Sequence, residues 1–186
     1  MAQRATIVVD TNVLLNLATP VVDGRPRAPT GEDPLKAVLT AYDVQVPSLV
    51  IGEVTEAAQS DDLLAAAATA VLAAADHLTA HDVDDGADGP TIGGLDAGES
   101  RAIRLANALD AAMLVTDEFD GANYVVVATM LDDGDSLYTT PHVLCALAEH
   151  GVLDDRYVHA ALSYYVDTKS WDEGYVDLLR ARYLDG

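Results

Sequence analysis

The sequence predicts an α/β protein of three layers, in which helices cover both faces of a central, mainly parallel β-sheet. Short runs of β-branched and apolar residues, such as the one at 6–9, alternate with longer stretches in which apolar residues recur every three or four positions. Strands that alternate with helices favour parallel pairing, because each helix returns the chain to the same end of the sheet. Half of the 186 residues are hydrophobic, which suffices for the core of one domain.

Each expected element follows from a local pattern. Compact apolar runs bounded by polar or turn residues predict strands at 6–9, 43–47, 112–118 and 136–140. Amphipathic or alanine-rich stretches, several of them bounded by capping or helix-stopping residues, predict helices at 12–19, 35–42, 48–58, 61–78, 97–109, 141–151, 154–169 and 172–184. The first of these helices should stop before Pro20, because proline cannot donate a helical hydrogen bond.

Three further segments are distinguished by composition. The segment 20–34 is rich in proline and glycine, and 82–94 is acidic and rich in glycine, so both are expected to be loops. The sequence pattern of the segment 121–131 fits two structures. Its valines favour a strand, whereas its position directly after a strand favours a crossover helix.

The chain is strongly acidic. Asp and Glu total 31 against 10 Lys and Arg, which gives a formal net charge of −21. Such a surface is typical of a salt-adapted proteome, such as that of a halophilic archaeon. At molar salt the Debye length falls to about 3 Å, so the repulsion between like charges is largely screened. The alternative is an acidic protein that avoids polyanions.

Cysteine content and hydropathy exclude several classes of protein. The single Cys145 excludes an internal disulfide framework and a cysteine-based zinc cluster. No signal peptide is recognised, and no apolar stretch approaches the ~18–20 residues that a membrane span requires. We therefore expect a cytoplasmic protein without a membrane partner.

Four acidic residues occupy comparable points of the expected elements: Asp10 ends the first strand, Glu53 lies in the early turns of the helix after the second strand, Glu99 lies in a first helical turn, and Asp117 ends the apolar run of the strand at 112–118. Taken singly, Asp10 is interpretable as a helix N-cap and Asp117 as a turn residue. Glu53 is interpretable as part of a solvated helix face, and Glu99 as a favourable charge at a helix N-terminus.

Together, the four acids predict a metal site. The carboxyl ends of parallel strands are where ligands bind in open α/β sheets, and the four residues are expected at that edge. Clustered carboxylates repel one another unless a cation neutralises them. Oxygen ligands without cysteine favour Mg²⁺ or Mn²⁺ over zinc.

The motifs that carry these acids resemble the PIN-domain family. The segments IVVDTNVLL, SLVIGEV, LDAGESRAIRLA and LVTDE occur in the order and at the spacing of that family, and TTPHVLCALAEHGVL is similar to the end of its VapC-like ribonuclease branch. The resemblance covers residues 5–153. It implies a PIN-like nuclease domain at 1–153, and it leaves 154–186 as a C-terminal helical extension packed on the same domain.

The resemblance also implies an activity, that of a metal-dependent endoribonuclease that hydrolyses RNA phosphodiester bonds with Mg²⁺ or Mn²⁺. Its catalytic and metal-binding residues would be the quartet Asp10, Glu53, Glu99 and Asp117. Many relatives have a second aspartate directly after the last of these. Here Glu118 stands at that position with Asp120 beyond it, so which of the two assists stays open.

Several other residues receive supporting roles from the resemblance. Asn12 and Thr116 match polar positions that help to hold the site in the family. Asp96 is a further acidic candidate, although it is also a good N-cap for the helix of Glu99. RNA requires cations, and the best local ones are Arg25, Arg27, Arg101 and Arg104, of which the last two are equally interpretable as partners of nearby acids.

The implied partners are an RNA substrate, an antitoxin protein in a type II toxin–antitoxin pair, and a second copy in a homodimer. An alternative of another class is a catalytically inactive PIN-fold protein that acts as a protein-interaction module. A phosphatase or receiver-like domain would also use an aspartate after a strand, but it would leave Glu53 and Glu99 without a purpose.

Three histidines of the C-terminal helices are expected at the surface rather than in catalysis: His142, His150 and His159.

Overall fold

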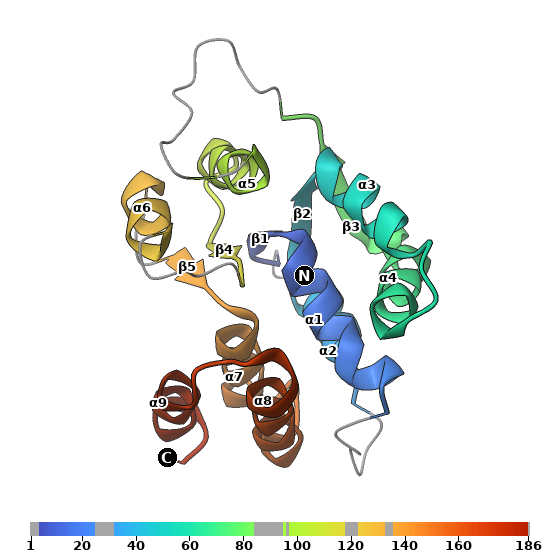
Figure 1. Ribbon diagram of the computed structural model, residues 1–186. Coiled ribbons are helices and arrows are strands. Elements are labelled where there is room, and N and C mark those ends of the chain that lie inside the picture. Colours follow the sequence, from blue (N-terminus) through green and yellow to red (C-terminus); the bar gives the residue numbers. More distant parts are fainter. Residues whose placement is uncertain are drawn as a thin grey trace.

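The computed structural model describes residues 4–24, 32–83, 95, 97–117, 123–132 and 136–185 (Figure 1). Its strands are β1 (Thr6–Val9), β2 (Asp43–Pro47), β3 (Leu78–His81), β4 (Met113–Val115) and β5 (Leu137–Tyr138). Its helices are α1 (Thr11–Val22), α2 (Pro34–Ala41), α3 (Ser48–Ala57), α4 (Leu63–Ala73), the short 3₁₀ helix η1 (Ala75–His77), α5 (Ala97–Ala108), α6 (Asn123–Met130), α7 (Thr140–Glu149), α8 (Asp155–Lys169) and α9 (Glu173–Tyr183).

The five strands form one parallel sheet in the order β3-β2-β1-β4-β5. Val8 of β1 is paired with Gln45 of β2 on one side and with Leu114 of β4 on the other. The chain first adds strands to one side of β1 and then returns to add β4 and β5 to the other side. The carboxyl ends of β1 and β4 therefore form the switch point of the sheet, which is where open α/β sheets bind their ligands.

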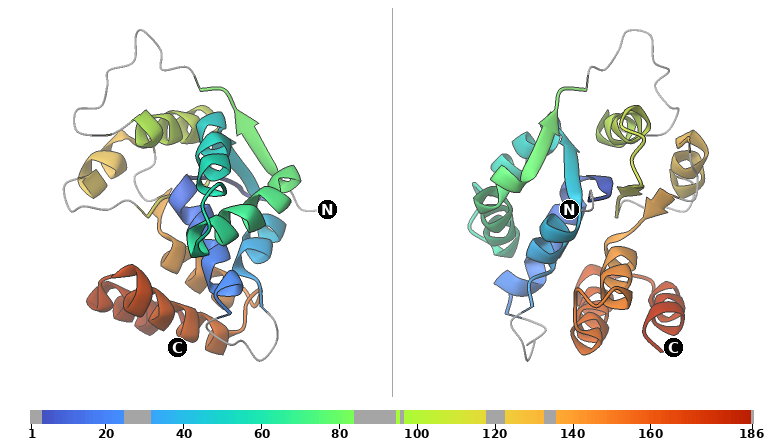
Figure 2. Two further views of the ribbon diagram at one scale, coloured as in Figure 1. Left: turned by 45° about the vertical axis from the view of Figure 1, so that its right-hand side comes forward. Right: turned by 180° about the vertical axis from the view of Figure 1, so that it is seen from behind.

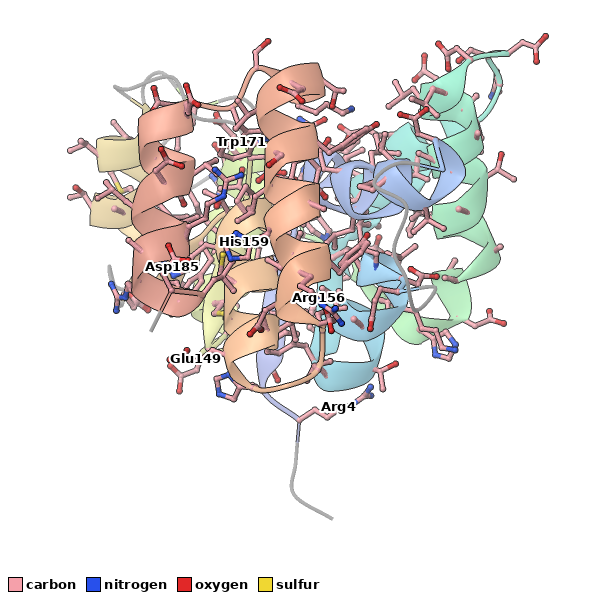
Figure 3. All side chains as sticks on the ribbon, turned by 90° about the horizontal axis from the view of Figure 1, so that it is seen from below. Arg4, Glu149, Arg156, His159, Trp171 and Asp185 are labelled. Carbon is pink, nitrogen blue, oxygen red and sulfur yellow. The ribbon has the colours of Figure 1, made fainter. Side chains whose placement is uncertain are left out.

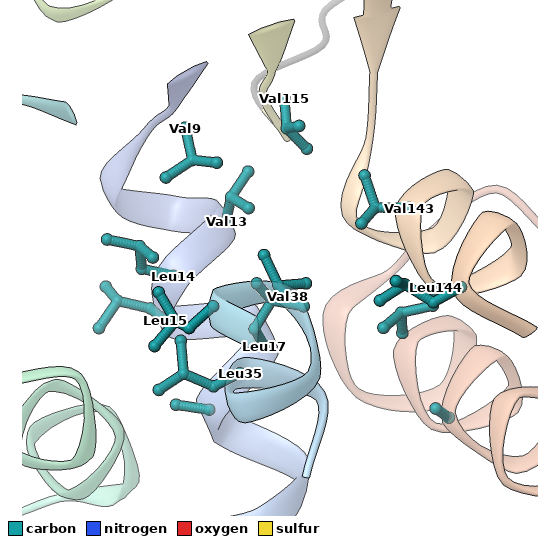
Figure 4. Close-up of a cluster of buried hydrophobic side chains, with 14 of the residues drawn as sticks. Val9, Val13, Leu14, Leu15, Leu17, Leu35, Val38, Val115, Val143 and Leu144 are labelled. Carbon is teal, nitrogen blue, oxygen red and sulfur yellow. The ribbon is translucent and has the colours of Figure 1, made fainter. Parts of the chain in front are cut away.

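Helices cover both faces of the sheet, so the predicted three-layer α/β/α architecture is confirmed. Side chains alternate along β1. Ile7 and Val9 join a large core with α1 to α4 and α7 to α9, whereas Val8 joins a second core with α5 and α6. Figures 1 and 2 show α3 and α4 on one side of the sheet and α5 and α6 on the other. Figure 4 shows part of the larger core, where Val9 and Val13 approach Val115.

Helix α1 continues past Pro20, so the expected end before that residue is wrong. The helix runs to Val22, and Pro20 is buried inside it. Proline has no N–H with which to reach the carbonyl of Asn16, four residues earlier. That carbonyl instead accepts a hydrogen bond of 2.8 Å from the hydroxyl of Tyr165 in α8. A tertiary contact thus replaces the missing helical bond.

The expected helix over 61–78 is too long, and a strand was missed at its end. Helix α4 stops at Ala73, η1 follows, and β3 then pairs with β2 from Val44↔Leu78 to Pro47↔His81. The alanine-rich sequence favours helix locally. Pairing with the edge of β2 overrides that preference at Leu78, the last residue of the expected helix, and β3 continues from there to His81.

The ambiguous segment 121–131 contains a helix, α6, over Asn123–Met130. Its valines have strand propensity, but parallel strands need a crossover connection, and α6 supplies it between β4 and β5. Val127 is buried in the second core, as expected for a helix that covers the sheet. The flanking strands are shorter than predicted, at three residues for β4 and two for β5.

The C-terminal helices α8 and α9 join the main core. Tyr157, Leu162 and Tyr165 of α8 and Val176 of α9 are buried in the same cluster as the residues of α1. In Figures 1 and 2 these two helices lie beside α7, at the end of the molecule remote from α5. Among the helices of the described ranges, none is both long and apolar enough to cross a membrane.

Candidate functional site

Asp10 lies at the carboxyl end of β1, at the switch point of the sheet. Its backbone is extended, and its Oδ1 accepts a hydrogen bond of 2.8 Å from the N–H of Val13. Its own N–H donates to the carbonyl of Val115 at 3.3 Å, which ties it to the end of β4. Asp10 is therefore the N-cap of α1. This capping bond engages one side-chain oxygen and so does not exclude a second role for the carboxylate.

Beside Asp10 lies a cleft of about 240 Å³. We use "the cleft" for this space, whose polar wall carries three members of the predicted quartet, Asp10, Glu53 and Glu99. They come from three separate parts of the chain: the start of α1, the middle of α3 and the first turn of α5. Apolar residues of α5, α6 and β4 form another part of the wall: Ala102, Ile103, Leu114 and Val127. The supporting residues Asn12 and Thr116 also line it.

Glu53 is exposed, yet its side chain is held at the cleft. Its Oε2 accepts a hydrogen bond from the hydroxyl of Thr11, the first residue of α1. Side chains on a helix lean toward its N-terminus, and the N-terminus of α3 follows the carboxyl end of β2. This lean carries Glu53 toward the edge of the sheet where Asp10 lies. The alternative expected for Glu53, a solvated helix face, agrees with its exposure, and the hydrogen bond from Thr11 is compatible with both interpretations.

Glu99 lies in the first turn of α5 and is half-buried, next to the buried Ser100. A negative charge at this place is stabilised by the helix dipole. A stabilising charge at a helix N-terminus and a metal ligand are therefore compatible roles for Glu99, because the helix N-terminus that favours the charge also lines the cleft.

Asp117 is placed differently from the other three acids. It follows β4 after Thr116, and its two oxygens accept three hydrogen bonds. Thr140 donates from its N–H to Oδ1 at 2.8 Å and from its hydroxyl to Oδ2 at 2.6 Å, and Asn16 donates from Nδ2 to Oδ2 at 2.7 Å. Asp117 does not line the cleft but a neighbouring hollow, and Asn12 lines both spaces.

The environment of Asp117 acts on its pKa in two directions. Burial raises the pKa of this carboxyl, and burial is the largest effect. The hydrogen bonds from Thr140 and Asn16, together with the positive charge of Lys169, lower the pKa and oppose burial in part. The net pKa is raised, so Asp117 binds a proton more readily than an exposed aspartate.

Asn16, Thr140 and Lys169 were not predicted from the sequence. Asn16 is an amide between Leu15 and Leu17 in a buried helix, which is a detectable signal because buried amides need partners. Thr140 begins α7 as one of two adjacent threonines. Lys169 carried no local signal, since it acts on Asp117 only after α8 has packed against the domain.

The remaining predicted residues lie elsewhere. Arg101 and Arg104 are half-buried on α5, and in the described part of the chain neither lines the cleft or the neighbouring hollow. His142 is half-buried rather than a surface residue, and burial lowers its pKa to about 4. Five further candidates lie outside the described residues: Arg25, Arg27, Asp96, Glu118 and Asp120.

The donor set matches a hard cation, because Asp10, Glu53 and Glu99 offer only carboxylate oxygens to the cleft. Nevertheless, among the residues that the structure describes, no three His, Cys, Asp or Glu side chains are close enough together to hold a metal ion. The convergence of the quartet on a shared metal thus stays a prediction. It requires a shift of side chains at the cleft.

Comparison with known proteins finds no match to this chain among protein-family models, curated proteins or solved structures.

Proposed function

We propose that this protein is a metal-dependent endoribonuclease that hydrolyses RNA phosphodiester bonds. The observation that carries the proposal is that Asp10, Glu53 and Glu99, which come from three separate segments, line one cleft at the switch point of a parallel sheet. Structural acids are normally spread over a surface, since carboxylates placed together repel one another. A shared cleft at the ligand-binding edge is what a cation-dependent site requires.

In this proposal Asp10, Glu53 and Glu99 hold Mg²⁺ or Mn²⁺, and Asp117 approaches the ion from the neighbouring hollow, which shares Asn12 with the cleft. When bound, the ion lowers the pKa of a water molecule and balances charge on the departing oxygen. The other residues act by position. Thr11 holds the carboxylate of Glu53, and Thr140 with Asn16 holds that of Asp117.

The proposal extends to partners. An RNA strand is the substrate, an antitoxin protein would block the site if the chain is the toxin of a type II pair, and a second copy would form a homodimer. A second candidate function is a catalytically inactive protein-interaction module. It is favoured by one observation, that no three described acidic or histidine side chains lie within metal-binding distance of each other.

Substitution of Asp10 by asparagine separates the two functions. Asparagine caps a helix about as well as aspartate, so Asp10→Asn keeps the cap on Val13 but removes a charge that a hard cation needs. Cleavage of single-stranded RNA in Mg²⁺ or Mn²⁺ should fall by about two orders of magnitude or more, whereas the melting temperature should hardly change. The assay is run at high salt, with EDTA in parallel.

A matched control is Asp62→Asn. Asp62 caps α4 by accepting a hydrogen bond of 2.9 Å from the N–H of Ala65, and it does not line the cleft. This variant should cleave RNA as the wild type does. Wild-type cleavage that persists in EDTA, or an Asp10→Asn protein as active as the control, would reject the nuclease proposal.

A further inference from the structure

A second hollow of about 1000 Å³ lies next to the cleft, and the two share Asn12. We call it the aromatic hollow. Asp117 and His142 line it from residues 1–153, and four residues line it from α8, α9 and the connection between them: Lys169, Trp171, Tyr175 and Arg182. Four of these six side chains therefore come from the part of the chain to which the resemblance to PIN domains does not extend. The hollow joins that part to an acid of the predicted quartet.

Flat rings form one wall of the aromatic hollow. The rings of Trp171 and Tyr175 are stacked, with centroids 6.0 Å apart and planes inclined by 25°. His142, which also lines the hollow, stacks on Tyr138 with ring centroids 4.1 Å apart, and its Nε2 is 2.7 Å from the hydroxyl of Tyr183. Trp171 and Tyr175 are half-buried and line the hollow beside polar side chains. Aromatic rings in such a groove are the feature on which proteins stack the bases of single-stranded nucleic acids.

Two cations complete the aromatic hollow, in a chain that has only 10 Lys and Arg against 31 acids. Among the described residues, neither Lys169 nor Arg182 forms an ion pair. Lys169 is near enough to Asp117 to affect its pKa. Lys169 is half-buried, and the exposed Arg182 has its guanidinium carbon 5.2 Å from the centroid of the Tyr183 ring. In a protein of this charge, lysine and arginine side chains beside aromatic rings are suited to a phosphate group.

The acids of the aromatic hollow are already engaged. Asp172 caps α9, where its Oδ1 accepts a hydrogen bond of 2.7 Å from the N–H of Tyr175. Asp117 accepts its three bonds from Thr140 and Asn16. These bonds direct carboxylate oxygens of both residues at protein donors, and among the described residues neither acid forms an ion pair with Lys169 or Arg182.

We propose that the aromatic hollow binds one nucleotide unit of a single-stranded RNA, with the base against Trp171 and Tyr175 and the phosphate against Lys169 and Arg182. The strand then continues past Asn12 into the cleft. The identity of the ligand as RNA rests on the proposed nuclease function. The hollow deepens that function by giving α8 and α9 a role, which is to hold the substrate strand in register with the carboxylates.

Binding can be followed at the site itself, because Trp171 is the single tryptophan of the chain. A single-stranded oligoadenylate of about eight nucleotides is titrated into the full-length protein with EDTA present, so that no cleavage occurs. The lowest salt concentration that keeps native circular dichroism is used, since salt weakens phosphate contacts. Stacking of a base on Trp171 should quench its fluorescence in a saturable manner.

The contribution of each cation is tested by Lys169→Gln and Arg182→Gln, and each variant should weaken binding about five- to tenfold. Arg156→Gln is the matched control, because it removes the same charge from the opposite end of α8, where the Arg156 side chain is 78% exposed and distant from Trp171 (Figure 3). Trp171→Ala, measured by the anisotropy of labelled RNA, should weaken binding about tenfold. Circular dichroism confirms that each variant is folded.

The outcomes separate this proposal from the nuclease proposal. Saturable quenching that Lys169→Gln and Arg182→Gln weaken supports the nucleotide site, even if no RNA is cleaved in Mg²⁺. Absence of quenching, or equal RNA affinity of wild type, Lys169→Gln, Arg182→Gln and Arg156→Gln, overturns the nucleotide site, even if the wild type cleaves RNA through the cleft.

Discussion

The hydroxyl of Tyr165 donates a hydrogen bond of 2.8 Å to the carbonyl of Asn16, the one that Pro20 leaves without a helical donor. The bond joins α8 to α1, 149 residues apart in sequence. Because α1 also carries Asp10 and Asn16, the C-terminal helices help to hold the element on which much of the candidate site is built.

Tyr165→Phe should lower the free energy of unfolding by about 1–3 kcal/mol, because the carbonyl of Asn16 is left without its donor in a buried place. The ring is fully buried and remains in the core, so the fold should survive. Denaturant unfolding at high salt measures the change.

A double-mutant cycle with Pro20→Ala tests the reason for this loss. Alanine at position 20 has an N–H that can reach the carbonyl of Asn16, so Tyr165→Phe should cost clearly less in the Pro20→Ala background. Equal costs in the two backgrounds would show that the lost hydroxyl matters for some other reason.

Thr11→Val should weaken the binding of the metal without affecting stability. Valine has nearly the shape of threonine but cannot donate to Glu53, whose carboxylate would lose its fixed orientation at the cleft. The Mg²⁺ concentration for half-maximal RNA cleavage should rise about tenfold. Thr55→Val is the control on α3, since the hydroxyl of Thr55 donates to the carbonyl of Ile51 and not to an acid. The prediction fails if both variants have the metal dependence of the wild type.

His142 should make the protein less stable as the pH falls. Burial and the charge of Arg182 lower its pKa to about 4 in the folded state, against about 6.5 when unfolded. Between these two pKa values the unfolded chain binds more protons than the folded one. The contribution of neutral His142 to the free energy of unfolding is therefore fully present above about pH 6.5 and is lost as the pH falls toward about 4. The free energy of unfolding should fall by about 1–2 kcal/mol over this range, a value that already allows for the solvent screening of this half-buried ring.

His142→Gln provides the reference for that measurement. Glutamine does not titrate, so the difference in unfolding free energy between wild type and variant should shrink as the pH falls from about 7.5 to about 4.5. Many carboxylates titrate in both proteins and cancel in the difference. A difference that stays constant over this range would contradict a lowered pKa.

Stability should rise with salt. The net charge of −21 repels itself in dilute buffer and is screened at molar KCl, so the melting temperature should be higher in molar salt. Sucrose strengthens burial without screening charge and serves as the control. If sucrose raises the melting temperature as much as KCl does, charge screening is not the cause.

Much of the fold was predictable because local patterns decide it. The apolar run of β1, the aspartate caps of α1 and α8, and the alternation of strands with helices all act within a few residues of one another. The same local logic placed Asp10, Glu53 and Glu99 at one edge of the sheet. Their positions follow from strand ends and helix starts, which the order of residues specifies directly.

The sequence by itself thus determined the three-layer architecture and the acids that line the cleft. Only the tertiary structure decided that β3 is a strand, since that segment pairs with β2 against the helical preference of the alanines before it. It also decided that Asp117 faces the aromatic hollow. The donors that orient this carboxylate, Asn16 and Thr140, lie 101 and 23 residues away, and their hydrogen bonds arise only when α1 and α7 have packed together. Contacts of that separation depend on the arrangement of the helices, and no local pattern specifies them.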